Sequence, residues 1–436
     1  MITMRLRRNH FVMRRSCIKK QNGAALLIML TILILGAASL LLGKLNKLNF
    51  QFEHYHESDQ SLLTAKEALI GWALSYSQRP GLLPVPDRRN DNLYDGESDC
   101  PNGAINTSHL LGQLPWKAYL STASCSSSRG GLGAQLKDAD GERLWYAVSA
   151  NLLYSSGYPT INSDTANLAA GWITVRDTQG NILSNRVAAV LLAPGKLLAG
   201  QNRSAAAPTA ANYLDSLTIG TTSYRNFDSD LDFIAGNESD SFNDRLTYIT
   251  IDELIAQVER KVGNTVRRCL DAYALASGGK YPWAAPLEGS ASPSYTGVYN
   301  AHFGRIPTTL STESSPGIND LVMSTSWPSS CFSVPGYWAS WQASIFYHVA
   351  PGYAPGSGSS CPTCLTLNSG GSYRAMVVMG RSALAGQSRA NNADKGTVTN
   401  YLEADNADID IDYENQSATA AFNDRVICID GSVLCK

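Results

Sequence analysis

The feature that most constrains this chain is an uncharged apolar run near its N-terminus, residues 23–43, which follows a basic segment. At about 1.5 Å per residue, a helix of this length is long enough to cross a bilayer. Residues 1–23 carry seven Lys and Arg, whereas only Lys44 and Lys47 follow the run closely. This charge bias predicts a single-pass protein whose N-terminus stays in the cytoplasm.

The apolar pattern continues beyond this run. Apolar residues recur every three, four or seven positions as far as Ala73, and no proline occurs before Pro80. Such spacing is typical of an amphipathic helix. The sequence therefore predicts one transmembrane and stalk helix over residues 24–78, roughly 80 Å long at the usual rise per residue.

The remainder of the chain repeats itself. Short segments recur in the same order, at similar distances along the chain. The matching pairs are 198–203 with 384–389, 213–215 with 401–403, 242–245 with 422–425, and 112–115 with 304–307. We therefore predict two copies of one unit, residues 79–250 and residues 251–436.

Each copy combines helix and strand signals. Thr250 and Glu253 have the spacing of a capping box, which predicts a second helix that ends near Gly278. Apolar runs or alternation predict strands at 143–150, 171–176, 186–192, 344–350 and 373–379. The predicted fold class is therefore α+β: a long N-terminal helix, then two units in which a helix packs on an antiparallel sheet.

Cysteine usage indicates an oxidising compartment. Of nine cysteines, Cys17 lies in the basic segment, and the other eight are an even number in loop-rich sequence. Eight cysteines allow 105 pairings, so the connectivity that we expect rests only on proximity. The expected pairs are Cys100–Cys125, Cys361–Cys364, Cys428–Cys435 and, from the two that remain, Cys269–Cys331. A Gly/Ser-rich stretch precedes Cys361, which favours a structural staple over a redox motif.

Charge and motifs exclude several functions. The whole chain carries a net charge of −2, and removal of the seven leader cations leaves −9. A body this acidic is a poor candidate for nucleic-acid binding, because phosphate contacts need clustered Lys and Arg. The sequence contains no nucleophile elbow, zinc-protease helix motif or phosphate-binding loop, so we do not expect an enzyme.

One acidic pattern suggests a metal. Three aspartates alternate with other residues in each copy: Asp228, Asp230 and Asp232, then Asp408, Asp410 and Asp412. On a strand, this alternation places three carboxylates on one face, where they could bind Ca²⁺. A solvated strand face is the simpler interpretation, because the loop of an EF-hand is absent. Calcium is the only cofactor that the sequence suggests.

The N-terminal region resembles the prepilin-like proteins of Gram-negative bacteria. The resemblance lies in segment 19–27 and in segments 68–73, 83–87 and 112–116. It implies that residues 1–23 are a leader, that a prepilin peptidase cuts after Gly23, and that Ala24 is N-methylated. It also implies an inner-membrane protein whose body is periplasmic or part of an extracellular filament, and whose N-terminal helix contacts other pilin or pseudopilin subunits.

Two departures from that family refine the expectation. Major pilins begin with Phe and carry Glu at the fifth position, where this chain has Ala24 and Ile28. Minor subunits at filament tips share the lack of this Glu. The resemblance therefore implies a minor or tip subunit of a type IV pilus or a type II secretion pseudopilus. The alternatives are a membrane-anchored adhesin or binding protein with a duplicated head, an anchor that is never cut and, more remotely, an anchored periplasmic enzyme.

Overall fold

The computed structural model describes most of the chain. The described residues are 22–76, 79–88, 94–99, 106–118, 130–153, 161–205, 207–287, 295–310, 327–333, 335–358 and 360–430. The chain divides into two compact units, Met1–Glu57 and Ser58–Lys436. Helix α1 (Asn22–Ser75) begins in the first unit and continues into the second.

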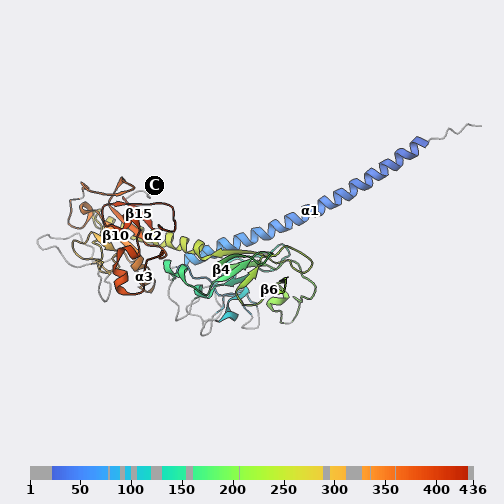
Figure 1. The fold of residues 1–436 in the computed structure, drawn as a ribbon, viewed down its shortest axis with the longest axis horizontal. Helices are drawn as coiled ribbons and strands as arrows, with labels where there is room; N and C mark the ends of the chain where they lie inside the picture. Colours follow the sequence, from blue (N-terminus) through green and yellow to red (C-terminus); the bar gives the residue numbers. More distant parts are fainter. Residues whose placement is uncertain are drawn as a thin grey trace, which may run out of the picture. The chain divides into compact units, whose positions relative to one another are not determined.

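The first half of the body is built on one sheet with a long central strand (Figure 1). Its strands are β1 (Leu111–Gln113), β2 (Trp145–Val148), β3 (Ile173–Arg176), β4 (Ile182–Ala193), β7 (Asp232–Ile234) and β8 (Arg245–Thr250). The order is β1-β2-β4-β3-β7, and β8 pairs with β4. All of these pairs are antiparallel except β3 with β7. A separate hairpin joins β5 (Ser216–Ile219) to β6 (Thr222–Arg225).

The second half repeats this pairing with shorter strands. Its main sheet has the order β15-β13-β10-β9. The strands are β9 (Phe303–Arg305), β10 (Ile345–Val349), β13 (Ala375–Met379) and β15 (Arg425–Ile429). Strands β11 (Leu365–Leu367), β12 (Gly370–Tyr373) and β14 (Asp412–Tyr413) form a smaller sheet. Strands β11 and β14 are parallel, as β3 and β7 are.

Helix α2 (Ile251–Ala276) opens the second half, where the sequence predicts it. The Thr250 hydroxyl accepts a hydrogen bond from the backbone N–H of Glu253, which caps the helix. The remaining α-helices of the described part are α3 (Pro335–Trp341) and α4 (Asn392–Gly396). Its 3-10 turns are η2 (Thr107–His109), η3 (Ala150–Leu152), η4 (Ser163–Asn167), η5 (Ala210–Asn212), η6 (Gln342–Ser344), η7 (Pro351–Tyr353), η8 (Val398–Asn400) and η9 (Ala404–Ala407).

A single hydrophobic core joins the two halves. Leu69 of α1, Tyr146 of the first sheet, Val258 of α2 and Tyr347 of the second sheet all belong to one buried cluster. Each sheet also has one smaller hydrophobic cluster on its other face. The body is therefore held together by α2 and the last turns of α1, which contribute apolar side chains to both sheets' shared core.

The predicted architecture is wrong in one respect, although the class is α+β. Within the described residues, no helix combines the length and the apolar character needed to cross a membrane; α1 continues without a break from its apolar start into polar sequence after Lys44. Residues from Ser58 onward form one compact unit, because Leu62 and Leu69 of α1 are buried in the body core.

Candidate assembly surface

The start of α1 presents large apolar side chains to solvent. Leu26 and Leu40 are each 73% exposed, and Ile28, at the position where major pilins carry Glu, is 60% exposed. The other exposed members are Leu27, Met29, Leu30, Ile32, Leu33, Ile34, Leu35, Leu41 and Leu42. Consecutive positions point in all directions around a helix, so no single rotation of the rod could hide them. Burial of each such side chain is worth about 1.5–3 kcal/mol, which makes a contact partner for this surface strongly favourable.

The polar groups of this segment are satisfied inside the helix. Thr31 Oγ1 donates to the carbonyl of Ile28 at 2.8 Å, and Ser39 Oγ donates to the carbonyl of Gly36 at 2.9 Å. Back-bonded hydroxyls of this kind need no partner from water. The predicted processing residues, Gly23 and Ala24, both lie in the first turn of α1. The apolar surface of residues 26–42 therefore begins directly after the predicted cleavage point.

The body carries two matching polar clusters, one in each half. In the first, Asp244 Oδ2 accepts hydrogen bonds from the backbone N–H of Asp215 at 2.8 Å and from Asn226 Nδ2 at 3.0 Å. Gln201 Nε2 donates to Asp215 Oδ1 at 2.8 Å. Arg203 donates to the carbonyls of Gly195 and Asn212 and stacks over the Tyr213 ring. These bonds link the turn before β5 to the turn before β8.

The second cluster makes the same bonds with residues from the repeated segments. Asp424 Oδ2 accepts from the backbone N–H of Glu403 at 2.9 Å and from Asn406 Nδ2 at 3.1 Å. Gln387 Nε2 donates to Glu403 Oε1 at 2.7 Å. Arg389 donates to the carbonyls of Arg381 and Asn400 and stacks over the Tyr401 ring. The repeated residues therefore serve the fold in both halves.

Burial perturbs the carboxyl groups of both clusters. The pKa of Asp244 lies well above its ordinary value because the group is buried, and the nearby Asp215 carboxylate raises it further. Burial, reinforced by the Glu403 charge, raises the pKa of Asp424 to about 8. Asp424 therefore carries its proton near neutral pH. Two carboxyl groups in contact in a dry site are stable with one shared negative charge.

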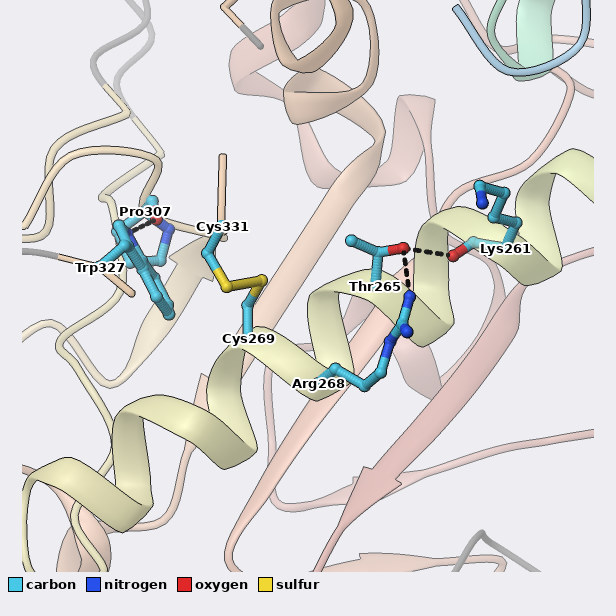
Figure 2. The surroundings of a disulfide bond; sticks show 7 residues. All are labelled: Lys261, Thr265, Arg268, Cys269, Pro307, Trp327 and Cys331. Atoms are coloured by element: carbon cyan, nitrogen blue, oxygen red, sulfur yellow. Dashed lines mark hydrogen bonds between the residues drawn. A yellow bond between two sulfur atoms is a disulfide. The ribbon is translucent and has the colours of Figure 1, made fainter. Parts of the chain in front are cut away.

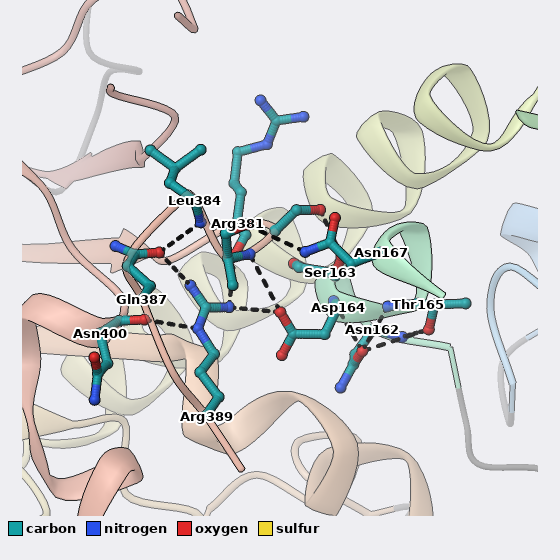
Figure 3. Close-up of polar contacts among 12 residues, drawn as sticks. Asn162, Ser163, Asp164, Thr165, Asn167, Arg381, Leu384, Gln387, Arg389 and Asn400 are labelled. Carbon is teal, nitrogen blue, oxygen red and sulfur yellow. Dashed lines mark hydrogen bonds and ion pairs between the residues drawn. The ribbon is translucent and has the colours of Figure 1, made fainter. Parts of the chain in front are cut away.

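The arginines of the two clusters differ in their acidic partners. Arg203 pairs with Glu142, which belongs to the same half, at 3.2 Å. Arg389 Nη1 instead pairs with Asp164 at 2.8 Å, and Asp164 lies in η4 of the other half (Figure 3). In the same contact, Asn167 Nδ2 donates to the carbonyl of Ala383, and Ser382 Oγ donates to the carbonyl of Ser163. Arg389 therefore links the two halves.

A second ion pair supports this contact from α2. Arg381 Nε donates to Glu259 Oε2 at 2.6 Å, and the Glu259 side chain is almost fully buried. Burial raises the pKa of Glu259, whereas the positive charge of Arg381 opposes that shift. Neither Arg389–Asp164 nor Arg381–Glu259 was predicted from the sequence. The match of Arg203 with Arg389 was the one signal that pointed to either pair.

Two of the expected disulfides lie within the described residues. Cys269 of α2 and Cys331 are bonded, with a Cα–Cα distance of 5.7 Å (Figure 2). Cys361 and Cys364 are bonded, with a Cα–Cα distance of 5.1 Å. Cys428 is disulfide-bonded, but Cys435, its expected partner, lies outside the described residues, as do Cys100 and Cys125.

The aspartate triplets do not form the strand face that we expected. Their first two members lie in the bends before β7 and β14, and only Asp232 and Asp412 lie in strands. The carboxylates mostly satisfy local donors: Asp230 accepts from the backbone N–H of Asp232, and Asp410 accepts from that of Asp412. Asp232 also pairs with Arg176. In the described part of the chain, no group of three or more His, Cys, Asp or Glu could hold a metal ion.

Comparisons of the chain with protein-family models, with curated proteins and with solved structures found no match.

Proposed function

We propose that this protein is a minor subunit of a filament of the type IV pilus or type II secretion pseudopilus class, matured by a prepilin peptidase that cuts after Gly23. The observation that carries the proposal is the exposed apolar surface of residues 26–42 on α1. In a filament, the equivalent helices of neighbouring subunits would cover this surface. The basic leader and Gly23 stand at the place where such a protein is cut.

The body supports a structural role. Its polar residues are engaged in matching hydrogen-bond clusters, and the Arg389–Asp164 ion pair links its halves. We interpret the two halves as a duplicated head that presents a rigid surface at one end of the filament. The disulfides Cys269–Cys331 and Cys361–Cys364 favour an oxidising compartment for this head.

The absence of an acidic group at residue 28 bears on the place of the subunit. In pilins the Glu at this position is thought to pair with the terminal amine of a neighbouring subunit. The Ile28 side chain carries no charge and cannot accept a hydrogen bond from that amine. We therefore propose a position at or near the filament tip, where the subunit needs neighbours on only one side.

The test is co-expression of the full chain with a prepilin peptidase, followed by intact-mass analysis. We expect loss of residues 1–23 and one methyl group on Ala24. The Gly23→Glu variant should keep its leader, whereas the matched Gly36→Ala variant should be cut normally, because an added Cβ at Gly36 meets no neighbouring atom within 4 Å. An uncut wild-type chain would refute the proposal.

A further inference from the structure

One face of α2 forms a basic groove that the proposed function does not use. The groove has a volume of about 560 Å³ and is lined by Leu74, Gln257, Arg260, Lys261, Asn264, Arg267 and Arg268. Apart from Leu74, these residues recur along α2 at steps of three or four, with Arg260 next to Lys261 and Arg267 next to Arg268, and so share one helix face. The opposite face, which includes Val258, Val262 and Val266, is buried in the core. The cations are therefore held on a rigid, anchored helix.

The positive charge of the groove is poorly neutralised. Lys261 donates no hydrogen bond and makes no ion pair within the described part of the chain. Among the residues that the structure describes, Arg268 bonds only the neighbouring Thr265 hydroxyl, at 3.4 Å (Figure 2). Arg267 meets Asp271 at 3.8 Å, and its buried Nε has no hydrogen-bond partner in the described segments. An anion in this groove would satisfy donors that the chain itself leaves open.

The second half carries an acidic segment that complements this groove. Residues 404–414 include the exposed carboxylates of Asp405, Asp408 and Asp410. Ion pairs to these three are absent among the described residues, whereas their counterpart region in the first half has the Asp232–Arg176 pair. Ile409 and Ile411, 45% and 44% exposed, alternate with the acids. The segment thus offers both charge for the arginines and apolar contact for Leu74.

We infer that residues 404–414 of one copy of this chain dock into the α2 groove of a second copy. The acidic segment and the groove are two different surfaces, so the contact is heterologous, and one copy can accept a neighbour while it docks onto another. This contact goes beyond the proposed function, since it needs neither the exposed apolar segment 26–42 of α1 nor processing at Gly23. Charge complementarity sets how residues 404–414 align along the α2 groove, and the alternating isoleucines exclude water from the contact.

The test is sedimentation of the full chain in detergent micelles, which cover residues 26–42 and leave only body contacts. We expect concentration-dependent self-association that weakens as NaCl rises from low to high concentration. Arg260→Glu with Arg268→Glu, or Asp408→Lys with Asp410→Lys, should each weaken association by at least about tenfold, as loss of close charge pairs does elsewhere. A mixture of the two charge-reversed proteins should associate again. The matched control is Lys137→Glu, which reverses an exposed cation outside the groove.

A second measurement identifies the segment. A fluorescein-labelled peptide of residues 404–414 should bind the wild-type chain, and the Arg260→Glu/Arg268→Glu variant should not bind it. Circular dichroism and melting temperature confirm that each variant is folded. Self-association that is unchanged by the reversals, is insensitive to salt, or is absent overturns the inference, as does binding of heparin without binding of the peptide. None of these results bears on leader cleavage, so the proposed function is tested separately.

Discussion

The two halves of the body share their internal polar clusters but differ at their edges. Asp244 and Asp424 accept the same backbone and amide donors, and Arg203 and Arg389 stack on equivalent tyrosines. Yet Arg203 pairs within its own half, whereas Arg389 reaches Asp164 across the contact. What the halves share maintains each fold unit. What differs joins them into one body and gives the second half its own surface.

The largest expected effect on stability is the loss of the Cys269–Cys331 disulfide in the second half. Replacing Cys269 and Cys331 by Ser opens a link between residues 62 apart, which should lower the free energy of unfolding by about 4 kcal/mol. The Cys361–Cys364 bond closes only a short ring. The matched change Cys361→Ser/Cys364→Ser should therefore cost about 2 kcal/mol or less. Urea unfolding of the full chain in micelles measures both, and equal losses would contradict the ranking.

The shared clusters should be equally important in both halves. Asp244→Ala and Asp424→Ala each leave a backbone N–H and an Asn amide unsatisfied, so each should destabilise the body by about 2–3 kcal/mol. The control Asp240→Ala, at an exposed position, should change stability by less than about 0.5 kcal/mol. If only one half responds, the clusters are not equivalent.

Removal of the acidic partners of Arg203 and Arg389 should have different effects on the contact between the halves. Asp164 and Glu142 are partly exposed, so either change to Ala should cost only about 1 kcal/mol. Asp164→Ala should nevertheless increase amide exchange in η4, because Arg389 no longer holds that turn on the second half. Glu142→Ala should leave exchange in η4 unchanged. Exchange measured by mass spectrometry would contradict this account if the two variants behaved alike.

The last prediction concerns the pH dependence of stability that comes from the buried Asp424 of the second half. Folding raises the pKa of Asp424 from 3.8 to about 8, so between these values the folded state binds the extra proton. The contribution of this group to stability is therefore present below pH 4 and is lost as pH rises towards 8. Asp424→Asn should flatten the decline in stability between pH 5 and pH 8. An unchanged slope would show that Asp424 is ionised in the folded protein.

Local signals predicted the elements well, but long-range contacts could not be read from the chain. The predicted strands coincide with β2, β3, β4, β10 and β13, and the capping residues Thr250 and Glu253 open α2. These predictions rest on periodicity and caps, which are properties of neighbouring residues. The union of both halves around one core depends on which faces of α1 and α2 meet, and a hydrophobic stripe does not specify its partner.

The candidate surfaces show the same limit. The apolar run of α1 was visible in the sequence, and its exposure follows from residues that are apolar on every side. The pairing of Arg389 with Asp164 joins residues 225 apart, and no spacing rule reaches that far. The prediction that each aspartate triplet lies on one strand face was wrong, because alternation implies one face only if the residues form a strand. Here each triplet forms bends stabilised by its own backbone donors.

Crosslinking from the exposed part of α1 tests the central claim most directly. A photo-crosslinking amino acid in place of Leu35 would be compared, in cells with a native filament system, with one in place of Leu197, which is exposed on the body. The account predicts that position 35 crosslinks to the N-terminal helix of a processed pilin-type subunit, identified by mass spectrometry, and that position 197 does not. Crosslinks from position 35 only to lipid, or to proteins without such a helix, would contradict it.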